Sequence, residues 1–140
     1  MMNLQAVDNA PAADLARLED HLDAFNAART GIFDARLLSI VLKDAAGEVY
    51  AGVHGHTWGR CCEIKTLWVA ETERGRGLGS ELLGAAEAEA LARGCRQVVL
   101  RTHSFQAPDF YARHGYRRLG AVEDYPAGHS EIQLVKPLAG

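Results

Sequence analysis

The 140-residue sequence has no long hydrophobic run, which argues against a membrane-spanning protein. No apolar stretch approaches the roughly 20 residues that a helix needs to cross a bilayer. Residues 1–20 carry acidic side chains where a secretory signal would carry basic ones, and no apolar segment follows them. We therefore predict a cytoplasmic protein with no membrane partner.

Cysteine is scarce as well, and its odd count argues against a disulfide framework. The three cysteines are Cys61, Cys62 and Cys95. Although His54 and His56 precede this pair, adjacent cysteines on a strand face opposite ways, and no second Cys/His pair has the spacing of a zinc finger. We predict reduced thiols, with Cys62 and Cys95 packing as small apolar groups, and no metal site.

A surplus of basic charge and a flexible linker are also missing. The formal net charge is −3, which argues against nucleic acid as a partner because phosphate binding usually needs a basic face. No stretch rich in proline, glycine or serine divides the chain. We expect one domain over residues 1–140, long enough to bury a core of its own.

Hydrophobic periodicity predicts a mixed α/β fold with a mostly antiparallel sheet and one parallel crossover. The predicted helices cover residues 14–28, 77–93 and 108–114, with Asp14 capping the first helix. The predicted strands cover residues 36–43, 49–58, 61–69, 97–102, 116–123 and 131–135. The parallel step joins the strands at 61–69 and 97–102, because a helix separates them in sequence.

The helix at 77–93 has a clear inner and outer face. Its inner face is predicted to consist of Leu78, Leu82, Ala86 and Ala90, and its outer face of Glu81, Glu87 and Glu89. A similar leucine and phenylalanine stripe marks the helix at 14–28 as amphipathic. We expect Trp68, which lies inside a strand, to be a core residue.

The most informative segment is the glycine-rich loop at residues 74–79 (RGRGLG), between a strand and a helix. Alternate glycines bring backbone N–H groups close to a ligand, and the helix start adds unpaired donors and a positive dipole end. With two arginines, these features describe a cradle for a pyrophosphate; the alternative is a tight turn with solvated arginines. A P-loop needs a GK[ST] ending, and a dinucleotide fingerprint needs a glycine where Ser80 stands. Neither nucleotide motif fits.

Two motifs in this region resemble those of the GNAT superfamily of N-acetyltransferases. The first is L-x-V at Leu67 and Val69 followed by R-x-x-G-x-G at Arg74, Gly77 and Gly79. The second is the A-x-x-F-Y-x-x-x-G-[FY] segment at residues 107–116. The order of predicted elements matches the same superfamily over nearly the whole chain.

This resemblance implies a sheet that splays near its middle and holds acetyl-CoA as co-substrate in the gap. The backbone of the strand at 61–69 would pair with the pantetheine arm, and the loop amides would bind the phosphates. The implied cofactor-binding residues are Leu67, Trp68, Val69, Arg74, Gly75, Arg76, Gly77, Leu78, Gly79 and Ser80.

The resemblance also suggests catalytic residues. Tyr111 matches the tyrosine that commonly protonates the departing thiolate, and a phenol with an ordinary pKa near ~10 is protonated at neutral pH. Glu63 lies where some members of the superfamily carry their general base, acting directly or through a water. The alternatives are that Tyr111 only packs, and that Glu63 only forms an ion pair with Lys65 on the same strand face.

The acceptor is least defined by the sequence. We predict an acetyl-CoA-dependent N-acetyltransferase that acts directly on a primary amine of a small molecule, with Trp58, Tyr125 and His129 as candidate substrate contacts. The alternatives are a peptide or protein acceptor, and a non-catalytic acyl-CoA-binding sensor. The resemblance further suggests a homodimer.

Overall fold

The computed structural model describes residues 2–139, and its internal contacts separate residues up to Phe33 from residues from Asp34 onward. Each of these two units is described by itself. The organisation of residues 1–140 as a single domain stays a prediction.

The first unit contains the helix α1 (Ala12–Thr30), which is longer at both ends than the sequence predicted. Ala12 and Ala13 are strong helix formers and extend the helix toward Pro11, so the expected cap at Asp14 is wrong: Asp14 lies in the first turn, where its charge suits the helix dipole. Gly31 ends the helix with a φ of 74° and donates its N–H to the carbonyl of Ala27. No residue of α1 is buried.

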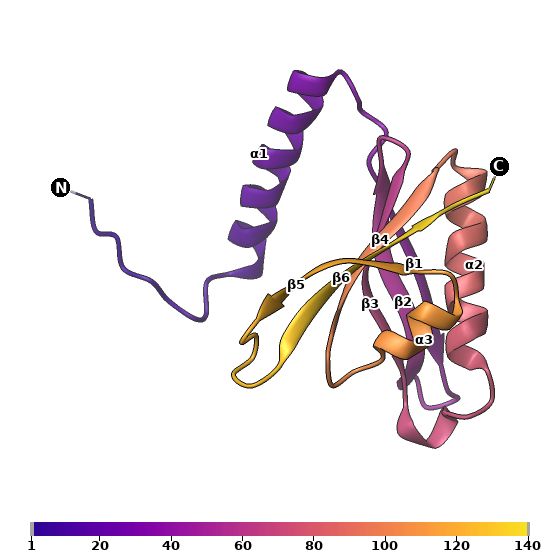
Figure 1. The fold of residues 1–140 in the computed structure, drawn as a ribbon. Helices are drawn as coiled ribbons and strands as arrows, with labels where there is room; N and C mark the ends of the chain where they lie inside the picture. Colours follow the sequence, from indigo (N-terminus) through magenta and orange to yellow (C-terminus); the bar gives the residue numbers. More distant parts are fainter. Residues whose placement is uncertain (1, 140) are drawn as a thin grey trace. The chain divides into compact units, whose positions relative to one another are not determined.

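The second unit is built on a mixed sheet (Figure 1). Within the described residues its strands are β1 (Arg36–Lys43), β2 (Val49–Trp58), β3 (Cys61–Val69), β4 (Gln97–His103), β5 (Arg117–Glu123) and β6 (Ser130–Pro137). They lie in the order β1-β2-β3-β4-β6-β5, and only β3 and β4 pair in parallel among them. The predicted strand boundaries agree with these to within two residues.

Two helices and a short 3-10 turn complete this unit. The 3-10 turn η1 (Glu71–Glu73) follows β3 and leads into α2 (Leu78–Ala92), and α3 (Pro108–Arg113) follows β4. The helix α2 packs against β1, β2 and β3. Its buried residues are Leu82, Leu83, Ala86 and Ala90, with Leu78 partly buried beside them. The inner face predicted for this helix is therefore confirmed, and so is the mixed, mostly antiparallel α/β fold.

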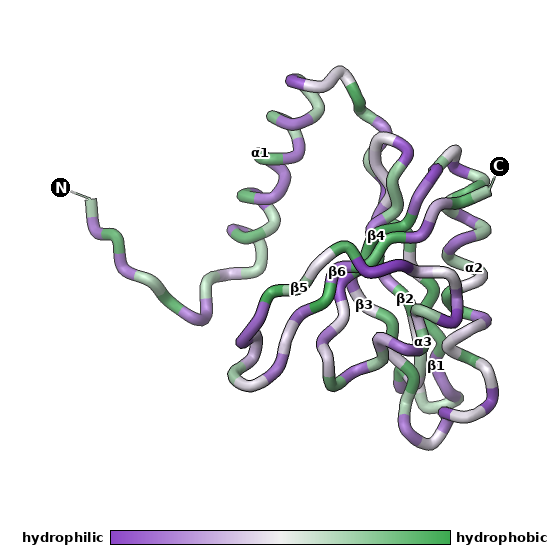
Figure 2. Tube along the Cα trace, viewed as in Figure 1, coloured by the Kyte–Doolittle hydropathy of each residue, from purple (hydrophilic) through white to green (hydrophobic). Residues whose placement is uncertain are grey.

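The core lies between the sheet and α2. Val53, Cys62, Leu83 and Val98 are its largest fully buried side chains. Figure 2 shows hydrophobic residues recurring along the strands and along α2, while the turn between β3 and α2 is mainly hydrophilic. Because alternate strand residues face α2, each strand contributes every second side chain to this core.

Two expectations about orientation are wrong. Glu87 does not point outward with Glu81 and Glu89; it is partly buried, because the chain after α3 covers that side of α2 and brings Tyr116 and Lys136 to it. Trp68 is not a core residue: it lies on the face of the sheet away from α2 and is 47% exposed.

Within residues 2–139, no helix is both long and apolar enough to cross a bilayer.

Candidate active site

The site begins where β3 and β4 part. The two strands pair from Cys61 and Gln97 as far as Ile64 and Leu100. Beyond this point β4 pairs only with β6, and β3 continues to Val69 beside β2. A gap therefore opens between β3 and β4 after Ile64. Every second residue of β3 turns its backbone N–H and C=O toward this gap, where no strand pairs with these groups.

A cleft of about 900 Å³ opens at this gap. Its walls come from the second half of β3, the loop before α2, the first turn of α2, the end of β4 and the helix α3. Of the predicted cofactor-binding residues, it is lined by Leu67, Trp68, Val69, Arg74, Gly75, Gly77, Leu78, Gly79 and Ser80. The predicted catalytic residue Tyr111 also lines it.

The loop before α2 is shaped by two glycines with left-handed backbones. Gly75 has a φ of 83° and Gly77 a φ of 79°, a conformation that side chains with a Cβ rarely adopt. Arg74 fastens this loop to the sheet, since its Nε donates a hydrogen bond of 2.9 Å to the carbonyl of Val69. Arg76 does not line the cleft; its guanidinium lies 3.6 Å from the carboxylate of Glu73, which does.

The first turn of α2 presents unpaired donors to the cleft. The first helical bond joins the Glu81 N–H to the Gly77 carbonyl, so the N–H groups of Leu78, Gly79 and Ser80 have no acceptor within the helix. The positive end of the helix dipole adds to these donors. This end of the cleft is suited to an anion such as a pyrophosphate.

Tyr111 lies in the cleft wall, on α3. It is 8% exposed, and its ring meets Phe110 and Tyr116 edge-on at centroid distances of 5.2 and 5.6 Å. Burial raises the pKa of the Tyr111 phenol above its usual value, so the phenol stays protonated at neutral pH. Among the described residues, no protein group forms a hydrogen bond with its hydroxyl. Every fully buried side-chain oxygen among these residues does have a partner, so the Tyr111 hydroxyl is not fully buried and faces the open cleft.

Glu63 lies beside the cleft rather than in its wall. It is opposite Val99 in the last paired stretch of β3 and β4, just before the strands part. Its side chain is exposed, on the face of the sheet away from α2. Among the described residues Glu63 forms no ion pair with Lys65. A β-bulge in β3, opposite His54 and Gly55, interrupts the alternation of side chains between the two faces of the strand, so a separation of two residues does not by itself put Glu63 and Lys65 on one face as expected.

Two of the three candidate acceptor contacts lie together. Tyr125 and His129 are in the turn between β5 and β6, where they form a ring cluster with His103 and Phe105. Phe105 stacks on His103 at 5.4 Å and also lines the cleft, which ties this cluster to the end of β4. Trp58 does not join them: it pairs with Cys61, at the opposite end of β3 from the gap.

Sequence reasoning missed several residues in the cleft wall. They are Ile64, Lys65, Thr66, Glu73, Leu100, Arg101, Thr102, Phe105, Gln106, Ala107, Phe110 and Arg113. The L-x-V and glycine motifs indicate only the parts of the wall that β3 and the loop form. The part that β4 forms exists because β4 separates from β3 after Leu100, which neither motif shows. The predicted parallel crossover was the one available signal, since it makes β3 and β4 neighbours.

The cysteines lie outside the cleft. Cys62 and Cys95 are buried apolar neighbours of the core, as predicted, and Cys61 is partly exposed on the other face of β3. Burial raises the pKa of the Cys62 thiol to about 11, with Cys95 and Cys61 adding to the effect. A thiol with such a pKa is a poor nucleophile at neutral pH.

Comparison with known proteins matches this architecture to one family. Residues 5–116 match the model of the acetyltransferase (GNAT) family. The chain is 40% identical over 114 residues to the blasticidin-S acetyltransferase of Streptomyces morookaense, covering 79% of this chain and 84% of that protein.

Solved structures give the same result. An acetyltransferase from Bacillus cereus superposes with a TM-score of 0.76 at 34% identity, covering 96% of this chain and 98% of that one. A nourseothricin acetyltransferase superposes with a TM-score of 0.64 at 25% identity, covering 76% of this chain and 66% of that one.

The fold and the cleft thus define an acyltransferase that uses a coenzyme A thioester. The chain belongs to the acetyltransferase (GNAT) family, and acetyl-CoA is its co-substrate.

Proposed function

We propose that this protein transfers the acetyl group of acetyl-CoA directly to a primary amine of a small molecule. The single observation that carries this proposal is the cleft between β3 and β4, which has anion donors at one end and the open hydroxyl of Tyr111 in its wall. The donor end suits a pyrophosphate, and the hydroxyl lies where the chain could deliver a proton to a leaving group.

The chain's own groups account for the steps of transfer. Bound acetyl-CoA supplies an activated acyl carbon, and the free backbone groups of Leu67 and its neighbours hold it along β3. Backbone N–H groups of β3 facing the gap would stabilise the oxyanion that forms as the amine attacks. The Tyr111 hydroxyl would give its proton to the thiolate that leaves as the carbon–sulfur bond breaks. The phenolate would recover a proton from the nitrogen of the adduct, which must lose one to become the amide, directly or through water. The low-dielectric wall that raises the pKa of Tyr111 also makes a thiolate in the cleft more basic.

The acceptor must lose a proton before it attacks. Lys65 and Arg101 line the cleft on either side of the gap, and neither forms an ion pair within the described residues. Nearby positive charge disfavours an ammonium and so favours the neutral amine. We assign removal of the proton to Glu63 through a water, because its exposed carboxylate lies just before the strands part.

A small acceptor is supported by two similar proteins, a blasticidin-S acetyltransferase and a nourseothricin acetyltransferase. The ring cluster of His103, Phe105, Tyr125 and His129 at the end of β4 offers flat apolar surfaces to such a molecule. We expect the enzyme to work in the cytoplasm, where its three free thiols stay reduced, and as a homodimer.

The test is release of free coenzyme A thiol when the protein receives acetyl-CoA with a panel of small amines, amino acids and peptides. We expect release with small-molecule amines, accompanied by an acetylated product of the expected mass. Release only with peptides would shift the acceptor class. Binding of acetyl-CoA without release on any acceptor would support a non-catalytic sensor and contradict the proposal.

A further inference from the structure

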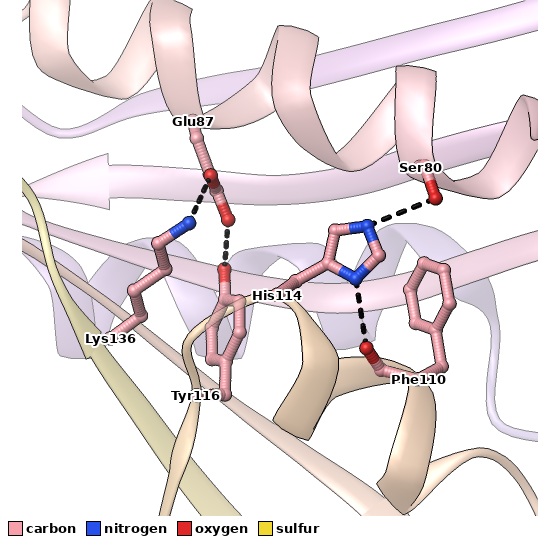
Figure 3. Close-up of polar contacts among 6 residues, drawn as sticks. All are labelled: Ser80, Glu87, Phe110, His114, Tyr116 and Lys136. Atoms are coloured by element: carbon pink, nitrogen blue, oxygen red, sulfur yellow. Dashed lines mark hydrogen bonds and ion pairs between the residues drawn. The ribbon is translucent and has the colours of Figure 1, made fainter.

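The side chains of Ser80 and His114 are joined although 34 residues separate them in sequence. His114 follows α3, and its Nε2 lies 2.9 Å from the hydroxyl of Ser80 (Figure 3). Its Nδ1 lies 2.9 Å from the backbone carbonyl of Phe110, and its ring packs on the Phe110 ring at a centroid distance of 4.5 Å. Both ring nitrogens are therefore engaged, and the imidazole has one orientation.

These two contacts determine where the hydrogens lie. A backbone carbonyl only accepts hydrogen bonds, so the Nδ1 of His114 must carry a hydrogen. In the neutral imidazole, Nε2 then has only a lone pair, and the Ser80 hydroxyl donates to it. In the protonated imidazole, Nε2 donates to the Ser80 oxygen, and the hydroxyl hydrogen of Ser80 becomes available for another acceptor.

The difference between these two states matters at the cleft. Ser80 is in the first turn of α2 and lines the cleft at its anion-binding end. The oxygens of a pyrophosphate are hydrogen-bond acceptors only. While His114 is neutral, Ser80 turns its hydrogen away from such an oxygen; once His114 is protonated, Ser80 can donate to it.

We propose that His114 is a positioning residue for the pyrophosphate of acetyl-CoA. It takes up a proton as the pyrophosphate binds, and Ser80 then donates its hydroxyl hydrogen to a phosphate oxygen. The inference rests on the acetyl-CoA cleft assigned above and adds a side-chain relay to its backbone donors.

The charges around this pair favour such a coupling. The elements around His114 carry these charged groups: Glu81, Glu87 and Glu89 on α2, Asp109 and Arg113 on α3, Arg74 and Arg76 in the loop, and Glu131 and Lys136 on β6. Glu87 and Lys136 neutralise each other at 2.8 Å, and Glu81 and Asp109 are exposed. Arg74 and Arg113 line the cleft. A bound pyrophosphate would add negative charge beside Ser80 and so favour the protonated imidazole of His114 in the complex.

The coupling predicts a pH dependence of affinity with a defined sign. At low pH, where His114 is protonated with or without ligand, the affinity is constant. As the pH rises through the range in which His114 is protonated only in the complex, the Kd rises by up to about tenfold per pH unit. At higher pH the affinity is constant again, with the Ser80 hydrogen bond lost.

Isothermal titration calorimetry with dephospho-CoA measures this directly. This probe keeps the pyrophosphate but lacks the 3′-phosphomonoester, a group whose own titration near pH ~6 would add protons to the balance. Titrations at one pH in two buffers of different ionisation enthalpy give the number of protons taken up. We expect net uptake by the wild-type protein at neutral pH, and none by His114→Gln, whose amide donates to Ser80 without titrating.

Two further variants separate this relay from a structural role. Ser80→Ala removes one oxygen and should weaken binding several-fold at pH 6 but little at pH 8.5. His21→Gln, an exposed histidine on α1, should keep the wild-type proton uptake.

No uptake by the wild-type protein, uptake that persists in His114→Gln, or an equal loss in Ser80→Ala at both pH values would each overturn the inference. If His114→Gln fails to fold, the two-pH comparison with Ser80→Ala decides alone. Absence of binding by the wild-type protein would instead overturn the assignment of the cleft, and the inference with it.

Discussion

The two ends of the cleft are formed by different kinds of chemical group. At the loop end, ligand-binding groups come from one continuous segment, residues 74–80, and most of them are backbone N–H groups held by glycine conformations and a helix start. At the end where we place the acceptor, the cleft is lined by side chains of β3, of β4 and of the turn after β4, brought together only by the order of the strands. Tyr125 and His129, in the turn between β5 and β6, reach this end through ring contacts with His103 and Phe105.

This difference has a functional consequence. Backbone donors bind a group that every acyl-CoA shares, whereas exposed side chains can be exchanged without loss of the fold. We therefore expect changes at the loop end to affect coenzyme binding, changes at the proposed acceptor end to affect acceptor binding, and a change at Tyr111 to affect turnover.

The largest effect is expected at Tyr111, in the wall of the cleft. Tyr111→Phe removes the proton donor while keeping the ring that packs on Phe110 and Tyr116. We expect kcat to fall by about 10²-fold or more, with the Kd of acetyl-CoA unchanged. Because burial raises the pKa of this phenol, Tyr111 should stay protonated through the usual range of a phenol, and kcat of the wild-type enzyme should fall only above that range.

Steady-state rates and calorimetry on the same preparations check this prediction. Tyr50→Phe is the matched control, since Tyr50 packs against the core and does not line the cleft. A Tyr111→Phe enzyme with wild-type kcat would remove Tyr111 from the mechanism.

A stability effect is expected beside the loop end. Glu87 accepts hydrogen bonds of 2.8 Å from both the Tyr116 hydroxyl and Lys136 (Figure 3), and the pKa of Tyr116 is raised by burial and by this carboxylate. Glu87→Ala leaves both partners partly buried and unpaired, which should lower the free energy of unfolding by about 2 kcal/mol. Urea unfolding measures this loss, and Glu81→Ala, an exposed site on the same helix, should change stability far less.

A smaller effect is expected for the glycine that begins α2. Gly77→Ala places a Cβ on a residue with a φ of 79°, which costs about 1 kcal/mol and distorts the loop. The Kd of acetyl-CoA should rise about fivefold, as seen by calorimetry. Gly84→Ala makes the same chemical change inside α2, where the added Cβ meets nothing within 4 Å, and should be neutral or stabilising.

The smallest effect tests the acceptor end. Phe105 lines the cleft, stacks on His103 and is 56% exposed. Phe105→Ala should raise the acceptor KM by about fivefold, equivalent to about 1 kcal/mol, and leave the Kd of acetyl-CoA unchanged. A rise in the acetyl-CoA Kd instead would show that the two ends are not independent. Phe33→Ala, at an exposed site outside the cleft, is the control.

The same contrast explains how far the sequence could be read. Runs of apolar and branched residues separated by turn residues predicted the bounds of β1, β2 and β3 to the residue, and the glycine spacing located the loop, because these features depend on local sequence. It could not show that Glu87 turns inward, since Tyr116 and Lys136 reach it from distant segments. Nor could it show that Trp68 is exposed, that Arg76 leaves the cleft or that Phe105 enters it, because each depends on which elements are neighbours in space.

The central claim is that acetyl-CoA occupies the loop end and the acceptor the other. Amide chemical shifts in a ¹H–¹⁵N NMR titration test it most directly. We predict that coenzyme A shifts the amides of Gly75 to Ser80 and leaves those of Phe105, Tyr125 and His129 in place, and that an amine acceptor found by thiol release then shifts the second set. Coenzyme A that shifts the second set and leaves the loop amides unchanged would contradict the account.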